Sequence, residues 1–193
     1  MARDDPKASG IIEAASKLFV AHGYAATSTD MIAAEANASK ATIYGRFGSK
    51  EDLFGAVLLD ACKGVEAPAP DRLTDETPLD ELLYLSGQAL LYRVFQPRAL
   101  ALIRAAIGAQ HAAPRALDIY WENGPGHAQR AVEAALTRAK ISDAPAKAKR
   151  FLNLVTGPFL LGVLVQGARL PTREEMDDAL DLVVSDFLDR LPL

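Results

Sequence analysis

The stretch "TDMIAAEANASKATIYGRFGSKEDL", residues 29–53, decides the fold of the first part of the chain. Hydroxyl side chains stand just before a short apolar pattern and can cap a helix over about 29–36. Asn37 follows, and asparagine adopts a left-handed conformation more readily than most residues, so a tight turn is expected there. Ser39 can cap a second helix that runs to about Phe47. The stretch therefore predicts two short helices joined by a turn of about three residues, which is the form of a helix-turn-helix.

Composition favours helices along the whole chain. Half of the 193 residues are apolar, only 7% are aromatic, and alanine and leucine outnumber valine and isoleucine. Such a composition favours helices packed on helices over a sheet. We predict an all-α chain of about nine helices, with an N-terminal three-helix domain that contains the helix-turn-helix and a C-terminal helical bundle. Cys62, the single cysteine, excludes an intramolecular disulfide framework and leaves open a buried or a redox-active thiol.

A proline-rich and acidic segment, "EAPAPDRLTDETP" at residues 66–78, separates two regions of helical periodicity. Segments of this composition usually connect domains. We place one domain at 1–64, with the helix-turn-helix at about 29–48, and a second at 65–193. Prolines break the apolar patterns of the second domain into predicted helices, which span 79–95, 98–112, 114–140, 145–168 and 172–190.

The charge pattern indicates a local contact with an anionic partner. The formal net charge of −4 argues against a protein that coats nucleic acid with its whole surface. No acid lies between Ser39 and Lys50, however, so this segment carries cations without an acid among them. The N-terminus has no apolar run behind its charges, and no segment reaches the length of a membrane span. We therefore expect a cytoplasmic protein without a membrane partner.

The cations of this segment suit DNA phosphates. Lys40, Arg46 and Lys50 can neutralise backbone phosphates, and the Tyr44 hydroxyl can donate to another. The free amides behind Ser49 offer an anion site at a helix N-terminus. These contacts would position DNA without reading its sequence.

The start of the second short helix suits base edges. Lysine at position 40 can address guanine, and Ala41 or the methyl group of Thr42 can touch a thymine methyl. Gly45 leaves the backbone bare and allows close approach. Spacing alone leaves open the alternative that the cations only solvate a helix face and that Tyr44 packs against the first helix.

Three stretches resemble the TetR family of bacterial transcriptional regulators. Residues 29–53 are similar to the helix-turn-helix signature of that family at many fixed positions together. The upstream "IIEAASKLFVAHGYAATS", residues 11–28, resembles its first helix and glycine-aromatic exit, so the resemblance covers roughly residues 7–62. Residues 150–188 resemble the paired last helices of the AefR-like subgroup. The resemblance implies a DNA-binding regulator.

The resemblance also implies roles for single residues. Asn37 and Ala38 replace the usual glycine and valine of the turn, and Gly45 and Arg46 replace a bulky aromatic residue and a histidine, so the operator sequence cannot be borrowed. Packing inside the motif is implied for Ala33, Ala36, Ile43 and Phe47. Together with the contacts inferred above, the predicted DNA site comprises Thr29, Ser39, Lys40, Ala41, Thr42, Tyr44, Gly45, Arg46 and Lys50.

The second domain is expected to dimerise and to bind an effector, both by resemblance. "FLNLVTGPFLLGVLVQGA", residues 151–168, is apolar nearly all round and must be covered on several sides, by a protomer core or by a subunit interface. The predicted dimer interface lies on the last two helices and comprises Leu154, Phe159, Val163, Gln166, Met176, Leu180, Val184 and Phe187. The predicted ligand site comprises Tyr92, Arg104, His111, Tyr120, Trp121, Asn123 and Phe159, for each of which an ordinary core or surface role stays open.

Enzyme motifs are missing from the sequence. The three histidines lack metal-ligand spacing, and neither a nucleophile elbow nor a phosphate-cradling glycine loop occurs. We therefore predict no catalytic residue, metal or cofactor. The leading hypothesis is a ligand-responsive repressor that binds a palindromic double-stranded DNA operator as a homodimer. The alternatives are a helical-bundle enzyme or small-molecule carrier with a vestigial helix-turn-helix, and a transcriptional activator.

Overall fold

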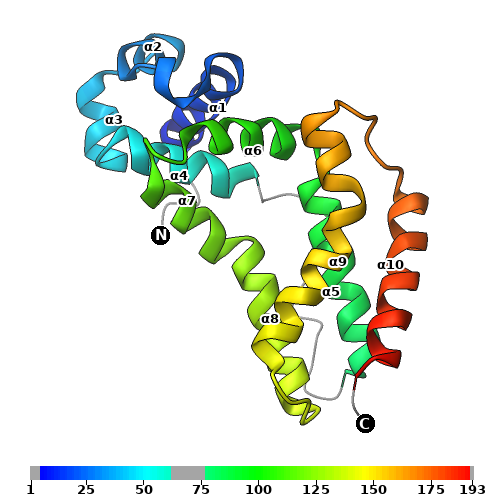
Figure 1. The fold of residues 1–193 in the computed structure, drawn as a ribbon. Coiled ribbons are helices and arrows are strands. Elements are labelled where there is room, and N and C mark those ends of the chain that lie inside the picture. Colours follow the sequence, from blue (N-terminus) through cyan, green and yellow to red (C-terminus); the bar gives the residue numbers. More distant parts are fainter. Residues whose placement is uncertain (1–4, 62–76, 192–193) are drawn as a thin grey trace. The chain divides into compact units, whose positions relative to one another are not determined.

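The computed structural model describes residues 5–61 and 77–191, and within these ranges it contains helices and no strands (Figure 1). The all-α prediction is confirmed. The predicted linker at 66–78 lies mostly outside the described residues, as does Cys62. The helices are α1 (Pro6–Ala26), α2 (Thr29–Glu35), α3 (Lys40–Phe47), α4 (Lys50–Ala61), α5 (Leu79–Val94), α6 (Pro97–Ala109), α7 (Pro114–Asn123), α8 (Pro125–Arg138), α9 (Ala144–Val165) and α10 (Arg173–Asp189).

The chain forms two compact units, and each of them is built from two separate segments of the sequence. The first unit contains Met1–Lys63 together with Pro97–Asn123, and the second contains Gly64–Gln96 together with Gly124–Leu193. Helices α6 and α7 thus pack with α1 and α4, although they follow the predicted linker. The division of function between residues 1–64 and 65–193 stays a prediction.

One predicted helix is interrupted. The pattern over 114–140 forms two helices, because Gly124 has φ −108° and ψ −105° and Pro125 begins α8 at its first turn. Proline is favoured at the first position of a helix, so Pro125 begins α8 while the apolar spacing continues across the break between the two helices. Gly23, with φ +76° and ψ 169°, interrupts the helical backbone of α1 one turn before its end at Ala26.

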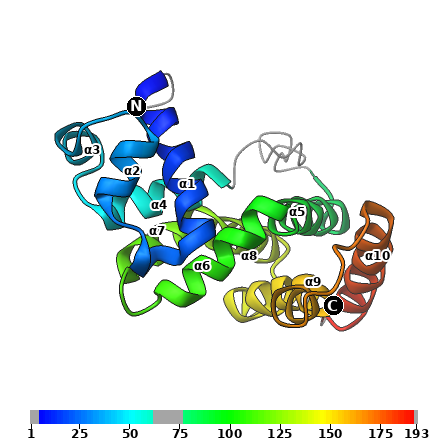
Figure 2. The same ribbon diagram turned by 90° about the horizontal axis from the view of Figure 1, so that it is seen from above.

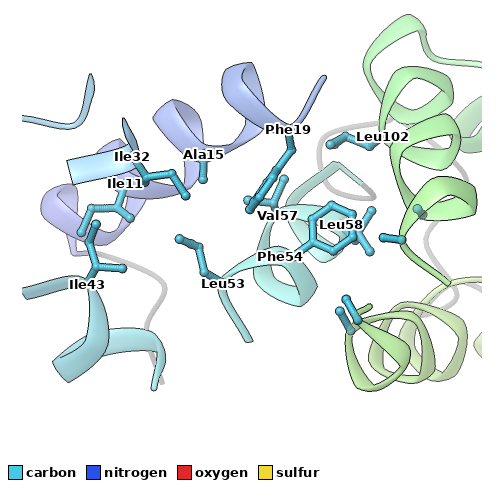
Figure 3. Packing of buried hydrophobic residues seen from close by; sticks show 14 residues of the cluster. Ile11, Ala15, Phe19, Ile32, Ile43, Leu53, Phe54, Val57, Leu58 and Leu102 are labelled. Carbon is cyan, nitrogen blue, oxygen red and sulfur yellow. The ribbon is translucent and has the colours of Figure 1, made fainter. Parts of the chain in front are cut away.

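A continuous apolar core holds the first unit together (Figure 3). Ile11 of α1, Ile32 of α2 and Ile43 of α3 are buried side by side, and Leu53 of α4 completes this end of the core. Farther along, the rings of Phe19 and Phe54 meet at 4.8 Å between centroids. The short helices α2 and α3 are therefore each anchored to the core of the first unit by a large buried side chain.

The second unit consists of α5, α8, α9 and α10, and α10 packs against both α5 and α9 (Figure 2). Gly87 allows the close approach of α5 and α10, because a Cβ at this position would lie 2.5 Å from Cδ1 of Leu180. Among the described residues, α9 is the one helix that is long and apolar enough for a membrane span, with a mean hydropathy of 1.3 over its best window. That test is also passed by core helices of soluble proteins, and only 28% of the window is buried within the structure.

Candidate nucleic-acid interface

The turn between α2 and α3 has the predicted local structure. The Ser28 side chain accepts a hydrogen bond from the Met31 amide at 3.1 Å, and Ser39 accepts one from the Thr42 amide at 3.0 Å. Asn37 between them has φ +47°, which is the left-handed conformation expected from the sequence. Each helix therefore begins at a side-chain cap, and the pair forms a helix-turn-helix.

Helix α3 has one buried face and one exposed face. Ile43 is buried, and Phe47 packs partly buried on the same core. Ala41 and Gly45 are exposed, and a Cβ added at Gly45 would meet nothing within 4 Å. The exposed face is therefore open to a partner that approaches the backbone closely.

Tyr44 and Thr29 form a polar pair on this surface. Tyr44 is 46% exposed, whereas Thr29 is buried, and their hydroxyl oxygens lie 3.2 Å apart within hydrogen-bonding distance. Thr29 therefore orients the tyrosine hydroxyl from beneath. The Thr42 hydroxyl is likewise engaged, because it lies 2.8 Å from the Ser39 hydroxyl.

Two of the predicted DNA-facing cations are paired with acids from other helices. Nζ of Lys40 lies 2.8 Å from Oδ2 of Asp30, which follows the first residue of α2. This hydrogen bond, together with the carboxylate charge, raises the pKa of Lys40. Arg46 forms an ion pair with Asp5, the residue that caps α1. Although the sequence between Ser39 and Lys50 contains no acid, the fold supplies two acids to it.

Lys50 has a third kind of partner. Its Nζ donates hydrogen bonds to the carbonyl oxygens of Tyr24 and Thr27, both at 2.8 Å, and lies 4.2 Å from the centroid of the Tyr24 ring. Partial burial lowers the pKa of this amine. The ammonium group thus ties the start of α4 to the end of α1, and only one of its three N–H groups is left for a phosphate.

The N-terminus of α4 carries its own carboxylate. The Ser49 hydroxyl donates to Oδ2 of Asp52 at 2.6 Å and accepts from the Asp52 amide at 3.0 Å. Hydrogen bonds from Ser49 and Arg115 hold the pKa of Asp52 below its ordinary value. The predicted anion site behind Ser49 therefore has a fixed negative charge beside it.

Arginines from α6 and α7 hold both ends of α4. The Arg115 amide donates to Oε1 of Glu51 at 2.7 Å, and the Arg115 guanidinium pairs with Asp52. At the other end, Arg98 donates from Nη2 to Asp60 at 3.0 Å and from Nε to the hydroxyl of Ser16 at 3.2 Å. The sequence gives no signal for these contacts, since the partners lie 38 to 82 positions apart.

The predicted ligand residues are divided between the two units. In the second unit, the Tyr92 hydroxyl donates to Asp177 at 2.7 Å, and burial together with this bond raises the tyrosine pKa to about 12. Phe159 packs edge-on against Phe95 at 5.7 Å. In the first unit, Arg104, His111 and Trp121 are exposed, and Tyr120 packs on the core. The side chain of Asn123 lies outside the described residues.

An open groove in the first unit has a volume of about 620 Å³ and contains none of these predicted ligand residues. It lies between α1, α6 and the end of α4, where Arg98 meets Asp60. Its lining comprises Ser9, Glu13, Ser16, Lys17, Val20, Asp60, Arg98 and Ala101.

The predicted interface residues fall into two groups. Five of them are buried inside the second unit, namely Val163, Met176, Leu180, Val184 and Phe187. Leu154 and Gln166 are exposed, and Phe159 is half-buried. Three other apolar side chains that the sequence did not single out are largely exposed: Leu161 at 72% and Val165 at 76%, one turn apart on α9, and Leu182 at 73% on α10. These residues and Leu154 are the apolar side chains of α9 and α10 that the protomer leaves uncovered among its large exposed hydrophobic residues.

Two capped helices, a left-handed turn and an exposed second helix define a helix-turn-helix protein of the DNA-binding class. The model of bacterial regulatory proteins of the tetR family matches residues 11–57. The model of the AefR-like transcriptional repressor C-terminal domain matches residues 81–190, more than half of the chain. The chain belongs to the TetR family of DNA-binding transcriptional regulators, as the resemblance implied.

Individual relatives agree with this assignment. An uncharacterized HTH-type transcriptional regulator of Bacillus subtilis, YhgD, is 36% identical over 81 residues, which are 42% of each chain. The HTH-type transcriptional repressor SCO4008 of Streptomyces coelicolor is 48% identical over 60 residues, 30% of this chain and 31% of the relative. The chain thus matches less than half of the length of these two relatives. A solved structure, the flavonoid-responsive regulator FrrA, is 27% identical with a TM-score of 0.71 over 96% of both chains.

Proposed function

We propose that this TetR-family regulator is a ligand-responsive repressor that binds a palindromic operator as a homodimer. The observation that carries the proposal is helix α3, which exposes Lys40, Ala41 and Tyr44 above the buried anchor Ile43. A recognition helix in the major groove needs this arrangement, because base edges are reached by its first residues while the helix stays fixed to its domain.

The exposed residues of α3 divide into base and phosphate contacts in this proposal. Lys40, Ala41 and the methyl group of Thr42 meet base edges, since the Thr42 hydroxyl is already engaged by Ser39. Tyr44 donates to a phosphate from a position fixed by Thr29. Gly45 lets the backbone approach the duplex, and Arg46 reaches a phosphate after leaving Asp5.

The uncovered apolar surface of α9 and α10 supports the homodimer. Leu161, Val165 and Leu182 are all more than two-thirds exposed. Large apolar side chains exposed together on two packed helices are typical of a protein interface. A two-fold dimer would present two α3 helices to half-sites about 34–36 Å apart.

The effector is a small molecule bound by the part of the chain after residue 64, which includes the AefR-like region at residues 81–190. Support comes from the match to an AefR-like repressor domain and from the likeness to a regulator whose name is flavonoid-responsive. Planar aromatic compounds are therefore the first class to screen. In this function the chain acts in the cytoplasm as a regulator and has no enzymatic role.

The test is selection of bound duplexes from a random DNA pool with the full chain. A recovered palindrome with half-sites one helical turn apart supports the proposal, and the absence of an enriched sequence contradicts it. Transcription from a promoter that carries the recovered site then fixes the sign. Lower output with the protein present supports a repressor, and higher output contradicts that part.

A further inference from the structure

The surface around α3 carries its own counterions. Asp30 from α2 holds Lys40, and Asp5 at the start of α1 holds Arg46. Both acids come from outside the segment between Ser39 and Lys50, which has none. The two cations that stand on the DNA-facing helix are therefore neutralised in the free protein.

These pairs are accessible to a competing anion. The side chain of Lys40 is 50% exposed and that of Asp30 is 73% exposed, so water and ions reach both partners. Exposed ion pairs are weak, and a phosphate can replace the carboxylate without a change in the fold. The Arg46 pair is more enclosed, and its carboxylate is also fixed by the Lys7 amide at 3.0 Å.

Resting on the proposed DNA-binding function, we infer that Asp30 and Asp5 are internal counterions that duplex DNA of any sequence must displace from Lys40 and Arg46. The two acids thereby set how strongly the protein binds DNA outside its operator. This role concerns residues that do not contact DNA themselves.

The inference has a thermodynamic signature. A lysine that binds a phosphate releases a condensed counterion from DNA, which gives the salt dependence of the affinity. When that lysine leaves a carboxylate, the carboxylate takes up a cation from solution and cancels the release. An exchanged pair therefore adds affinity only weakly and adds little to the salt slope, whereas a free lysine adds about 0.9 to the slope.

Binding of the full chain to a random-sequence duplex, measured by fluorescence anisotropy between 50 and 200 mM salt, tests this with Asp30→Asn. We expect tighter binding, by up to roughly eightfold at 0.1 M salt, with a slope steeper by up to about 0.9. Asp5→Asn should act in the same direction, since asparagine keeps the helix cap while removing the charge.

Glu13→Gln is the matched control. It removes one negative charge from an exposed pair with Lys17 on α1, where Nζ and Oε1 are 3.3 Å apart. An equal effect of Asp30→Asn and Glu13→Gln would overturn the inference, because net charge would then explain both. Weaker binding by Asp30→Asn would overturn it as well.

A double variant separates the pair from the charge. In a Lys40→Ala background, Asp30→Asn should lose most of its effect on the salt slope, and an undiminished effect contradicts the exchange. Failure of the proposed function has a different appearance. If the proposed DNA-binding function is wrong, the unaltered chain binds no duplex even at 50 mM salt. If the unaltered chain binds with a measurable affinity, the effects of the variants on that affinity decide the counterion role alone.

Discussion

Replacement of Lys50 tests whether this residue anchors the fold or binds a phosphate. Its ammonium group donates to the carbonyls of Tyr24 and Thr27 at 2.8 Å each. A hydrogen bond from a charged donor contributes about 1.5–3 kcal/mol, and partial exposure lets water replace part of both bonds. We expect Lys50→Ala to lower the free energy of unfolding by about 1–2 kcal/mol. For a chain of this length the Tm should fall by roughly 2–8 °C.

DNA binding by the same variant gives a second readout. An anchor positions α3 through the end of α1, so Lys50→Ala should weaken DNA binding and leave the salt slope unchanged. A lost phosphate contact would instead reduce the slope by about 0.9. Lys50→Arg should recover only part of the stability, because the wider planar guanidinium fits poorly where a single ammonium nitrogen lies 2.8 Å from both carbonyl oxygens. An unchanged Tm for Lys50→Ala, with a reduced slope, would refute the anchoring role.

Three further substitutions probe packing, charge and assembly. Gly87→Ala places a Cβ against Leu180, so the free energy of unfolding, measured in urea, should fall by up to about 2 kcal/mol. Its control is Gly10→Ala, where the added Cβ meets open space and should raise this free energy by up to about 1 kcal/mol. The fold lowers the pKa of Asp52 below its ordinary value of 3.8, so the ionised carboxylate stabilises the folded state at pH values above 3.8. This stabilisation is lost as the pH falls through the lowered pKa of the folded state. The Tm difference between the unaltered chain and Asp52→Asn should therefore close below about pH 4. Leu182→Glu should shift light scattering from dimer to monomer and leave the far-UV circular dichroism unchanged.

Local signals in the sequence were sufficient for the helix-turn-helix. Caps at Ser28 and Ser39 and the left-handed Asn37 involve neighbours within three positions, so they could be read directly from the chain. The acids that pair with Lys40 and Arg46 could not be read from the charge pattern of the segment, because they lie far away in the sequence. Asp30 is ten positions from Lys40, and Asp5 is farther still from Arg46, so only the packing of α1, α2 and α3 brings these charges together.

The second half of the chain was less predictable because its periodicity fits several arrangements. Apolar spacing marks Met176 and Phe187 as buried on α10 but does not tell a protomer core from a subunit interface, and the structure uses both in the core. Leu161 and Leu182 fall at the same helical apolar spacing, yet both are exposed. Gly124 was missed as a break because Pro125 follows it at a position where a helix readily begins.

Helix α4 links the DNA-facing helices to the rest of the chain. Leu53 and Lys50 join it to α3 and α1, while Arg98 and Arg115 hold its two ends from α6 and α7. Helices α6 and α7 occupy Pro97–Asn123, and the chain passes directly from α5 into α6 and from α7 into α8. A displacement of α5 or α8 therefore acts covalently on the two helices whose arginines hold α4. These contacts are ion pairs and hydrogen bonds between partly exposed side chains, so each adds only modestly to the free energy of folding. The packed core beneath α3 resists such a shift, so α3 should move with α4 as one body.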